Sequence, residues 1–165
     1  MAQRPVKINV PKLGLRTKLQ DKLAKLIGQA TSRKVATQTL LDMVNEYNLV
    51  PVSLGTDNEY GGNLRASGRA TEKLVIWGDK DVPYAHYVYE GIIYRPNFPI
   101  YWMGNIVGWR SPKGKKKYPS GEYMSYTEWQ PERHWDKALI RDHRREYNIR
   151  VTNEMKRIAK DRGKI

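Results

Sequence analysis

The segment VPVSLGTDNEYGGNLRASGRA (50–70) divides the chain into a helical part and a strand-rich part. Pro51 disfavours helix at the residue before it, and the glycines at 55, 61 and 62 supply turns. The word NLRAS follows at once, and its Asn63 is a residue type that caps a helical turn. Because the apolar pattern changes period after this segment, we predict that it redirects the chain from helix into sheet.

On the N-terminal side, apolar residues recur at helical spacing from 15 to 26 and again from 36 to 47. We predict one long helix over 13–48, preceded by an arm over 1–12. Only Gly28 and a short polar run interrupt the pattern, so a helix pair folded back at Gly28 is the alternative. A continuous helix would be about 50 Å long, and part of it is then expected to pack on another subunit.

On the C-terminal side, KLVIWG (73–78) and YAHYVYEG (84–91) are rich in β-branched and aromatic residues and are predicted to be strands. A third strand is predicted within IIYRPNFPIYWMG (92–104), where Pro96 and Pro99 favour a sheet edge. The polar stretch GWRSPKGKKKYPSGEYMSYTEW (108–129) is predicted to be a long basic loop. Over 131–165 the apolar spacing is helical again, with a tail at the end.

This order of elements predicts an α+β fold, in which a small antiparallel sheet is covered by a long N-terminal helix and a C-terminal helix. The length of 165 residues fits a single domain, with the sheet over 50–130 and the last helix over 131–165.

The composition narrows the choice of partners. A net charge of +13 and a pI near 9.9 attract polyanions or acidic proteins. The absence of cysteine excludes disulfides and thiolate metal sites. The N-terminus MAQRPVKINV lacks the apolar core of a secretion signal, and no long apolar run occurs. We therefore expect no membrane partner and a protein that is not exported.

The sequence offers no convincing catalytic, cofactor or metal set. His86, His134 and His143 lie far apart without metal-ligand spacing; His86 is predicted to be a bonded or surface histidine, and the other two to be solvated. Asp142 and Glu146 lie one helical turn apart among arginines, which predicts surface ion pairs. The glycine-rich segment matches no phosphate-binding motif. We therefore expect no cofactor, no metal and no enzymatic activity.

Aromatic and basic residues alternate through the region 101–129. The candidate binding residues are Trp102, Trp109, Arg110, Lys113, Lys115, Lys116 and Lys117. Aromatic rings stack on bases while lysines contact phosphates, which favours a nucleic-acid-binding protein. The same residue types anchor protein interfaces, and a basic loop also docks on an acidic neighbour. The sequence leaves both interpretations open.

Two short sequence motifs, which we call the first and second words, resemble motifs of the small neck proteins of long-tailed bacteriophages. These are the tail-completion or minor capsid proteins that join head to tail. Their first word is a Pro, a polar turn with Thr-Gly, and Leu-Arg-x-Ser; their second is Pro-Tyr-Ala-x-Tyr-Val followed by an acidic residue and Gly. The matching positions are Pro51, Gly62, Leu64, Arg65, Ser67, Pro83, Tyr84, Ala85, Tyr87, Val88 and Gly91. The first turn departs from the family pattern, because SLGTDNEYG expands it and Gly61-Gly62 stands in place of Thr-Gly.

The resemblance extends to the order of elements, with a helix before the first word, aromatic strands and a variable loop after the second, and a closing helix opened by a Trp, here Trp135. It implies a structural virion protein of the neck, made in the cytoplasm of a host bacterium. Such proteins form a homo-oligomeric ring of sixfold or twelvefold-related symmetry at the head-tail junction. The implied partners are other phage connector and tail proteins and the DNA in the channel. A basic nucleic-acid-binding protein that uses the aromatic, lysine-rich loop is the alternative.

Overall fold

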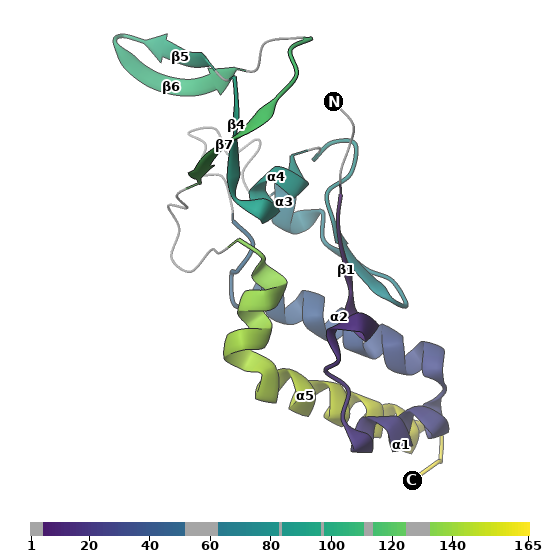
Figure 1. The fold of residues 1–165 in the computed structure, drawn as a ribbon. Helices are drawn as coiled ribbons and strands as arrows, with labels where there is room; N and C mark the ends of the chain where they lie inside the picture. Colours follow the sequence, from purple (N-terminus) through teal and green to yellow (C-terminus); the bar gives the residue numbers. More distant parts are fainter. Residues whose placement is uncertain (1–4, 52–62, 83, 97, 111–113, 125–132) are drawn as a thin grey trace.

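The computed structural model describes residues 5–51, 63–82, 84–96, 98–110, 114–124 and 133–165. Small antiparallel sheets pack with N-terminal helices and a long C-terminal helix, which confirms the predicted α+β fold (Figure 1). Long helices form the lower part of the molecule in this view, and a pair of two-stranded ribbons extends from the upper end.

The three-stranded sheet has the order β1-β3-β2, and both pairings are antiparallel. β1 (Val6–Asn9) and the 3-10 helix η1 (Val10–Leu13) occupy the segment predicted to be an arm, so that prediction is wrong. Val6 and Ile8 face the core because alternate side chains of a strand share one side. β3 (Leu74–Trp77) confirms the strand predicted at KLVIWG, and β2 (Arg69–Ala70) pairs with it.

α1 (Lys18–Ile27) and α2 (Gln29–Glu46) are separate helices, so the predicted continuous helix over 13–48 is wrong and the helix pair is found. Gly28 lies between them with a φ of 92°, a conformation that a residue without a Cβ adopts at little steric cost. A capping box starts α1: the Thr17 hydroxyl accepts the Gln20 backbone N–H, and the Gln20 side chain accepts the Thr17 N–H. Since α1, α2 and the C-terminal helix pack on one another, Leu23, Ala24 and Ile27 of α1 are buried, whereas Leu19 and Leu26 are exposed.

α5 (Trp135–Asp161) confirms the predicted C-terminal helix and is kinked at His143, whose φ of −126° is not helical. α1 packs against α5, and the two helices run in the same direction. At one end the Gln20 amide donates to the Asn148 carbonyl (3.2 Å), and at the other Arg162 donates to the Ile27 carbonyl (2.6 Å). Across the described ranges, no helix combines the length and apolarity that a membrane span requires.

The core lies between these three helices and the β1-β3-β2 sheet. Its largest fully buried side chains are Trp77, Trp135, Tyr147, Leu40, Met43, Leu139 and Met155.

The strand predicted over 84–91 is wrong, because this segment is the helix α4 (Ala85–Glu90). Ala85, Val88 and Tyr89 recur at helical spacing and pack on the core, and this packing outweighs the strand preference of aromatic residues. Gly91, with a φ of 66°, ends the helix. α3 (Asn63–Ala66) confirms the helical turn predicted at NLRAS.

The segment IIYRPNFPIYWMG forms two strands where one was predicted, β4 (Ile92–Arg95) and β5 (Phe98–Trp102). β6 (Asn105–Arg110) and β7 (Tyr118–Tyr123) take up part of the predicted basic loop, so 108–129 is not a loop throughout. β4 pairs with β7 and β5 pairs with β6, each antiparallel. We call the described residues between 92 and 124 the ribbon arm.

Candidate assembly surface

The two words that resemble phage neck proteins meet in space at Gly78. Ser67 of the first word donates its hydroxyl to the Leu64 carbonyl (2.6 Å) and accepts the Gly78 backbone N–H (2.8 Å). Ala85 of the second word lies against the same glycine: a Cβ built on Gly78, whose φ is 87°, would lie 2.5 Å from the Ala85 Cβ. We call Ser67, Gly78 and Ala85 the motif junction. Sequence reasoning missed Gly78, whose only signal was a glycine at the end of a predicted strand.

Arg65 attaches the first word to the end of the helical body. Its guanidinium donates to the Asn48 side-chain oxygen (3.0 Å) and to the Val50 carbonyl (2.7 Å). Leu64 beside it is buried, and Pro51 is half-buried. The contacts of Arg65 therefore join α3 to the chain that follows α2.

Polar contacts anchor α4 on the start of α5. The Tyr89 hydroxyl donates to Asp136 Oδ1 (2.7 Å), and the His134 backbone N–H donates to the Tyr89 carbonyl (3.0 Å). His134 was predicted to be solvated, but it is half-buried and its Nε2 lies 3.1 Å from Glu90 Oε2. Burial raises the pKa of Asp136, against the lowering effect of the Tyr89 hydrogen bond. Burial, and then the charge of Asp136, raises the pKa of Tyr89, so its hydroxyl keeps the proton that it donates.

Packed rings continue this anchor into the core. Tyr89 meets Trp135 edge to face, with ring centroids 4.9 Å apart, and Trp135 meets Trp77 in the same way at 5.5 Å. Such edge-to-face pairs are favoured by the ring quadrupoles. The orientation of α4 relative to the body is thus set by ring packing as well as by hydrogen bonds.

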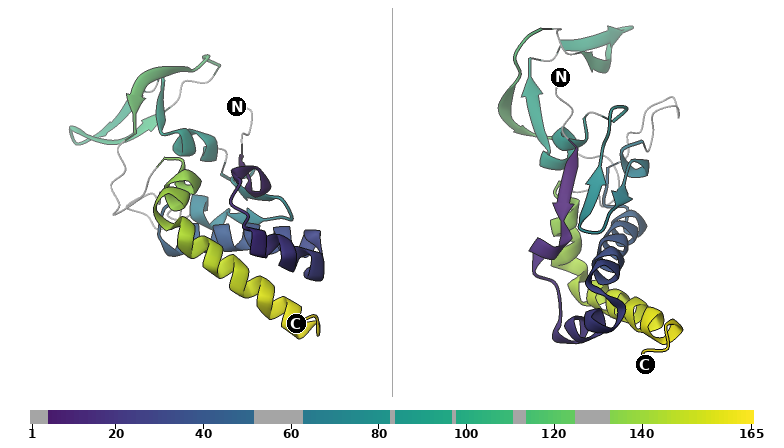
Figure 2. Two further views of the ribbon diagram at one scale, coloured as in Figure 1. Left: turned by 60° about the horizontal axis from the view of Figure 1, so that its bottom comes forward. Right: turned by 90° about the vertical axis from the view of Figure 1, so that its right-hand side faces the viewer.

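The ribbon arm starts directly after α4. Tyr87 packs on Tyr94 with ring centroids 4.9 Å apart, and the Gly91 carbonyl accepts the Met124 N–H (2.8 Å). Tyr84, at the start of α4, is 40% exposed. Beyond this base, β5 and β6 pack mainly on each other, and Figure 2 shows their hairpin projecting away from the helices.

The tip of the β5–β6 hairpin exposes large apolar side chains to solvent. Tyr101 is 62% exposed, Trp102 67% and Met103 86%. Phe98 and Tyr123, elsewhere on the arm, are exposed as well. Contiguous exposed apolar side chains of this kind mark interaction surfaces in soluble proteins.

The basic candidates do not gather around this tip. Lys115 and Lys116 are exposed, and Lys117 is half-buried. Figure 1 shows the segment that carries them and the β5–β6 hairpin extending to opposite sides of the β4–β7 ribbon. The structure therefore does not bring Trp102 together with these lysines.

Five further sequence candidates are only partly covered by the structure. Trp109 and Arg110 form the end of β6, where they pair with Pro99 and Phe98 of β5. Lys113, Gly62 and Pro83 lie outside the described residues.

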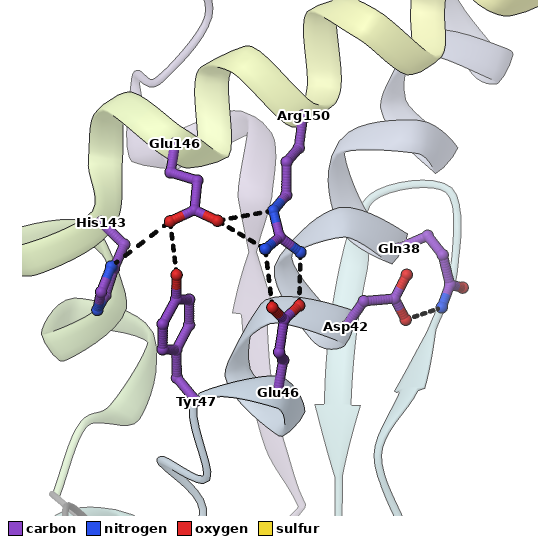
Figure 3. Close-up of polar contacts among 7 residues, drawn as sticks. All are labelled: Gln38, Asp42, Glu46, Tyr47, His143, Glu146 and Arg150. Carbon is purple, nitrogen blue, oxygen red and sulfur yellow. Dashed lines mark hydrogen bonds and ion pairs between the residues drawn. The ribbon is translucent and has the colours of Figure 1, made fainter.

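A cluster of titratable side chains joins the end of α2 to α5 (Figure 3). Arg150 donates to both carboxylate oxygens of Glu46 (2.5 and 2.8 Å) and to Glu146 (2.6 Å), and the Tyr47 hydroxyl donates to Glu146 (2.5 Å). His143, predicted to be solvated, is half-buried, and its ring stacks on Tyr47 with centroids 3.8 Å apart.

Two carboxylates share the guanidinium of Arg150 in this network. The Arg150 hydrogen bond lowers the pKa of Glu46, and the hydrogen bonds from Tyr47 and then Arg150 lower the pKa of Glu146. Both carboxylates are thus held ionised, and the contacts tie two helices together. The pairing of Glu146 with Arg150, and of Asp142 with Arg141, confirms the predicted surface ion pairs. In the part of the chain that the structure describes, no three metal-ligating side chains cluster.

No protein-family model, no curated protein and no solved structure matches the chain. Its function is therefore inferred from the contacts above and from the two sequence words.

Proposed function

We propose that this chain is a structural virion subunit that forms a ring at the head-tail junction of a long-tailed bacteriophage. The observation that supports the proposal is the ribbon arm, whose tip displays Tyr101, Trp102 and Met103 outside the core. The likeness of the two words to those of phage neck proteins supplies the biological setting. In this proposal the chain catalyses no reaction, and its activity is to bind copies of itself and the connector and tail proteins stacked around the DNA channel.

The composition and shape of the tip favour a protein partner. Tyr, Trp and Met are enriched at the centres of protein interfaces, and complete burial of a large apolar side chain contributes about 1.5–3 kcal/mol. A two-stranded ribbon without a hydrophobic face to pack on is marginally stable in water. Docking of the tip on a neighbouring subunit therefore supplies stabilisation that an isolated subunit lacks.

The ribbons also leave backbone groups for a neighbour. β4–β7 and β5–β6 are each two-stranded, so within the described residues every strand of the arm has one unpaired edge. Unpaired N–H and C=O groups at such an edge accept a further strand from another chain. A neighbouring subunit can thus add to the ribbon as well as bury its tip.

Ring closure requires that the arm leave the body at a fixed angle. A tip that docks on a different surface of the next subunit makes a heterologous contact, which closes into a ring only at the correct rotation. The motif junction and the Tyr89–Asp136 anchor hold α4, from which the arm starts. This gives the two words a role in assembly: they set the direction of the arm.

The test compares two double variants of the full-length chain. Trp102→Ser with Met103→Ser removes the apolar tip, and Leu19→Ser with Leu26→Ser removes two exposed leucines of α1 as a matched control. Mass photometry and negative-stain images should show closed rings for the wild type and the control, and smaller species for the tip variant. Antibodies against the chain should label the neck of virus particles.

Two results would count against the proposal. One is a wild-type chain that stays monomeric at about 50 µM and is absent from purified particles. The other is a tip variant that forms the same rings as the wild type, which would show that the ribbon arm does not carry the contact.

A further inference from the structure

Among the three packed helices α1, α2 and α5, unpaired positive charge lies mainly on α1 and α5. The acidic side chains of these two helices already have ion-pair or hydrogen-bond partners. Asp21 pairs with Arg16, Asp142 with Arg141, Glu146 with Arg150, and Glu154 and Asp161 both pair with Arg157. The remaining acid, Asp136, is buried against Tyr89. Seven exposed cations of the two helices have no partner among the described residues: Lys18, Lys22, Lys25, Arg144, Arg145, Lys156 and Lys160.

Helical spacing places six of these cations in two rows. Lys18, Lys22 and Lys25 recur at i, i+4 and i+7, so they share one side of α1, opposite the side that is buried through Leu23 and Ile27. On α5, Arg145, Lys156 and Lys160 recur at i, i+11 and i+15, which is again one side of the helix.

The two rows lie on helices that pack against each other. Gln20 of α1 donates to the Asn148 carbonyl and to the Thr152 hydroxyl of α5, each at 3.2 Å. Because Thr152 lies between the buried side of α5 and its row of cations, that row is on the flank of α5 next to α1. The same flank carries an open groove of about 580 Å³, lined by Arg144, Arg145, Asn148, Ile149, Thr152 and Asn153. We call the seven cations and this groove the basic face.

We infer that the basic face binds the phosphate backbone of double-stranded DNA without sequence preference. Lysines, arginines and short polar side chains such as Asn and Thr are the usual phosphate contacts. Protein interfaces, in contrast, are depleted of lysine at their centres and rich in aromatic residues, and Ile149 is the single apolar side chain that lines the groove. These features favour nucleic acid over an acidic protein.

The shape of the face favours a duplex over a single strand. Among the described residues, the two rows and the lining of the groove contain no aromatic side chain. The face therefore offers no ring on which unpaired bases could stack. From 145 to 160 the row on α5 spans about 22 Å, the axial length of six to seven base pairs. This inference does not depend on the proposed ring, since it uses a different part of the molecule from the ribbon arm.

The test is a comparison of two quadruple variants with the same net charge. The face variant is Lys18→Gln, Lys22→Gln, Arg145→Gln and Lys156→Gln. The control variant is Lys73→Gln, Lys80→Gln, Lys115→Gln and Lys116→Gln, which removes four exposed lysines from outside α1 and α5, two of them from the predicted basic loop. Binding to a fluorescent duplex of about 30 base pairs is followed by anisotropy from about 50 to 300 mM KCl.

The face variant should bind at least about tenfold more weakly than the wild type at 100 mM salt, and the slope of log affinity against log salt should fall by about 3. The affinity of the control variant for the duplex should fall by less than about threefold. Circular dichroism checks that all three proteins fold. A second readout uses the unmodified protein: duplex should protect Lys18, Lys22 and Lys156 from acetylation more than Lys73 and Lys80.

Several outcomes would overturn the inference. These are no duplex binding by the wild type at low salt, equal losses in the two variants, a larger loss in the control variant, or equal protection of all the lysines. Polyglutamate that displaces the labelled duplex as well as unlabelled duplex does would assign the face to acidic proteins instead.

Discussion

Gly78→Ala tests the motif junction directly, because two separate features require glycine at this position. The φ of 87° lies in the left-handed region, which is unfavourable for a residue with a Cβ, and the added Cβ would lie 2.5 Å from the Ala85 Cβ. Both atoms are fixed close to the backbone, so neither moves away by a side-chain rotation. β3 and α4 would have to shift apart.

The size of the effect follows from these two features. A left-handed conformation costs alanine about 1–2 kcal/mol, and overpacking of a buried site costs about 1–3 kcal/mol, so the free energy of unfolding should fall by about 2–5 kcal/mol. Gly14→Ala is the matched control, because Gly14 has a φ of 63° but no atom of the described residues lies within 4 Å of the added Cβ. Gly14→Ala should lower the free energy of unfolding by about 1–2 kcal/mol only, the cost of the left-handed backbone conformation.

Urea unfolding followed by circular dichroism measures these differences, and a double-mutant cycle with Ala85→Gly isolates the contact. If the methyl groups clash, Gly78→Ala should cost about 1–3 kcal/mol less in the Ala85→Gly background than in the wild type. Recovery is partial, because the added Cβ also lies 3.0 Å from the Val82 carbonyl oxygen. Equal losses in Gly78→Ala and Gly14→Ala, with no coupling to Ala85, would refute the close approach of the two words.

Two further predictions concern the polar contacts. Tyr89→Phe removes the hydroxyl that donates to the buried Asp136 carboxylate, so the free energy of unfolding should fall by about 1–3 kcal/mol at pH 7. The pKa of Asp136 is raised, so its carboxyl takes up a proton as the pH falls. Urea titration in acid should therefore find a smaller loss of stability. Hydrogen bonds lower the pKa of Glu46, through Arg150, and of Glu146, through Tyr47 and then Arg150. The stability that these carboxylates contribute is therefore present above their unfolded pKa and is lost as the pH falls through the folded one. The free energy of unfolding measured from pH 6 to pH 2 should therefore decline less steeply in Arg150→Gln than in the wild type, and parallel profiles would contradict this.

The parts of the fold that depend on local periodicity could be predicted from sequence. The stripe of Leu139, Tyr147, Val151 and Met155 located α5, and the β-branched run at 74–77 located β3. The prediction at 84–91 failed because aromatic residues favour strands in general, whereas here the burial of Ala85 and the capping by Gly91 decide for a helix.

The candidate surface was harder to predict, since its geometry depends on contacts between distant residues. Gly78 matters because of Ala85, and Tyr89 because of Asp136, which lies 47 positions further along the chain. Alternating aromatic and basic residues suggested one mixed surface, but the β5–β6 hairpin and the segment 114–117 extend to opposite sides of the β4–β7 ribbon. Sequence order alone carries no information about that direction.

The chain leaves the body after Gly91 and returns to it at Met124, and these two residues are joined by a backbone hydrogen bond of 2.8 Å. The intervening excursion therefore begins and ends at nearly one point, and the side chains at its tip contribute nothing to the core of the three helices. Insertions, deletions or a wholesale exchange of the excursion can occur there while the body keeps its packing. In the proposed role as a virion subunit, such changes would alter what the chain recognises and retain the scaffold that presents it.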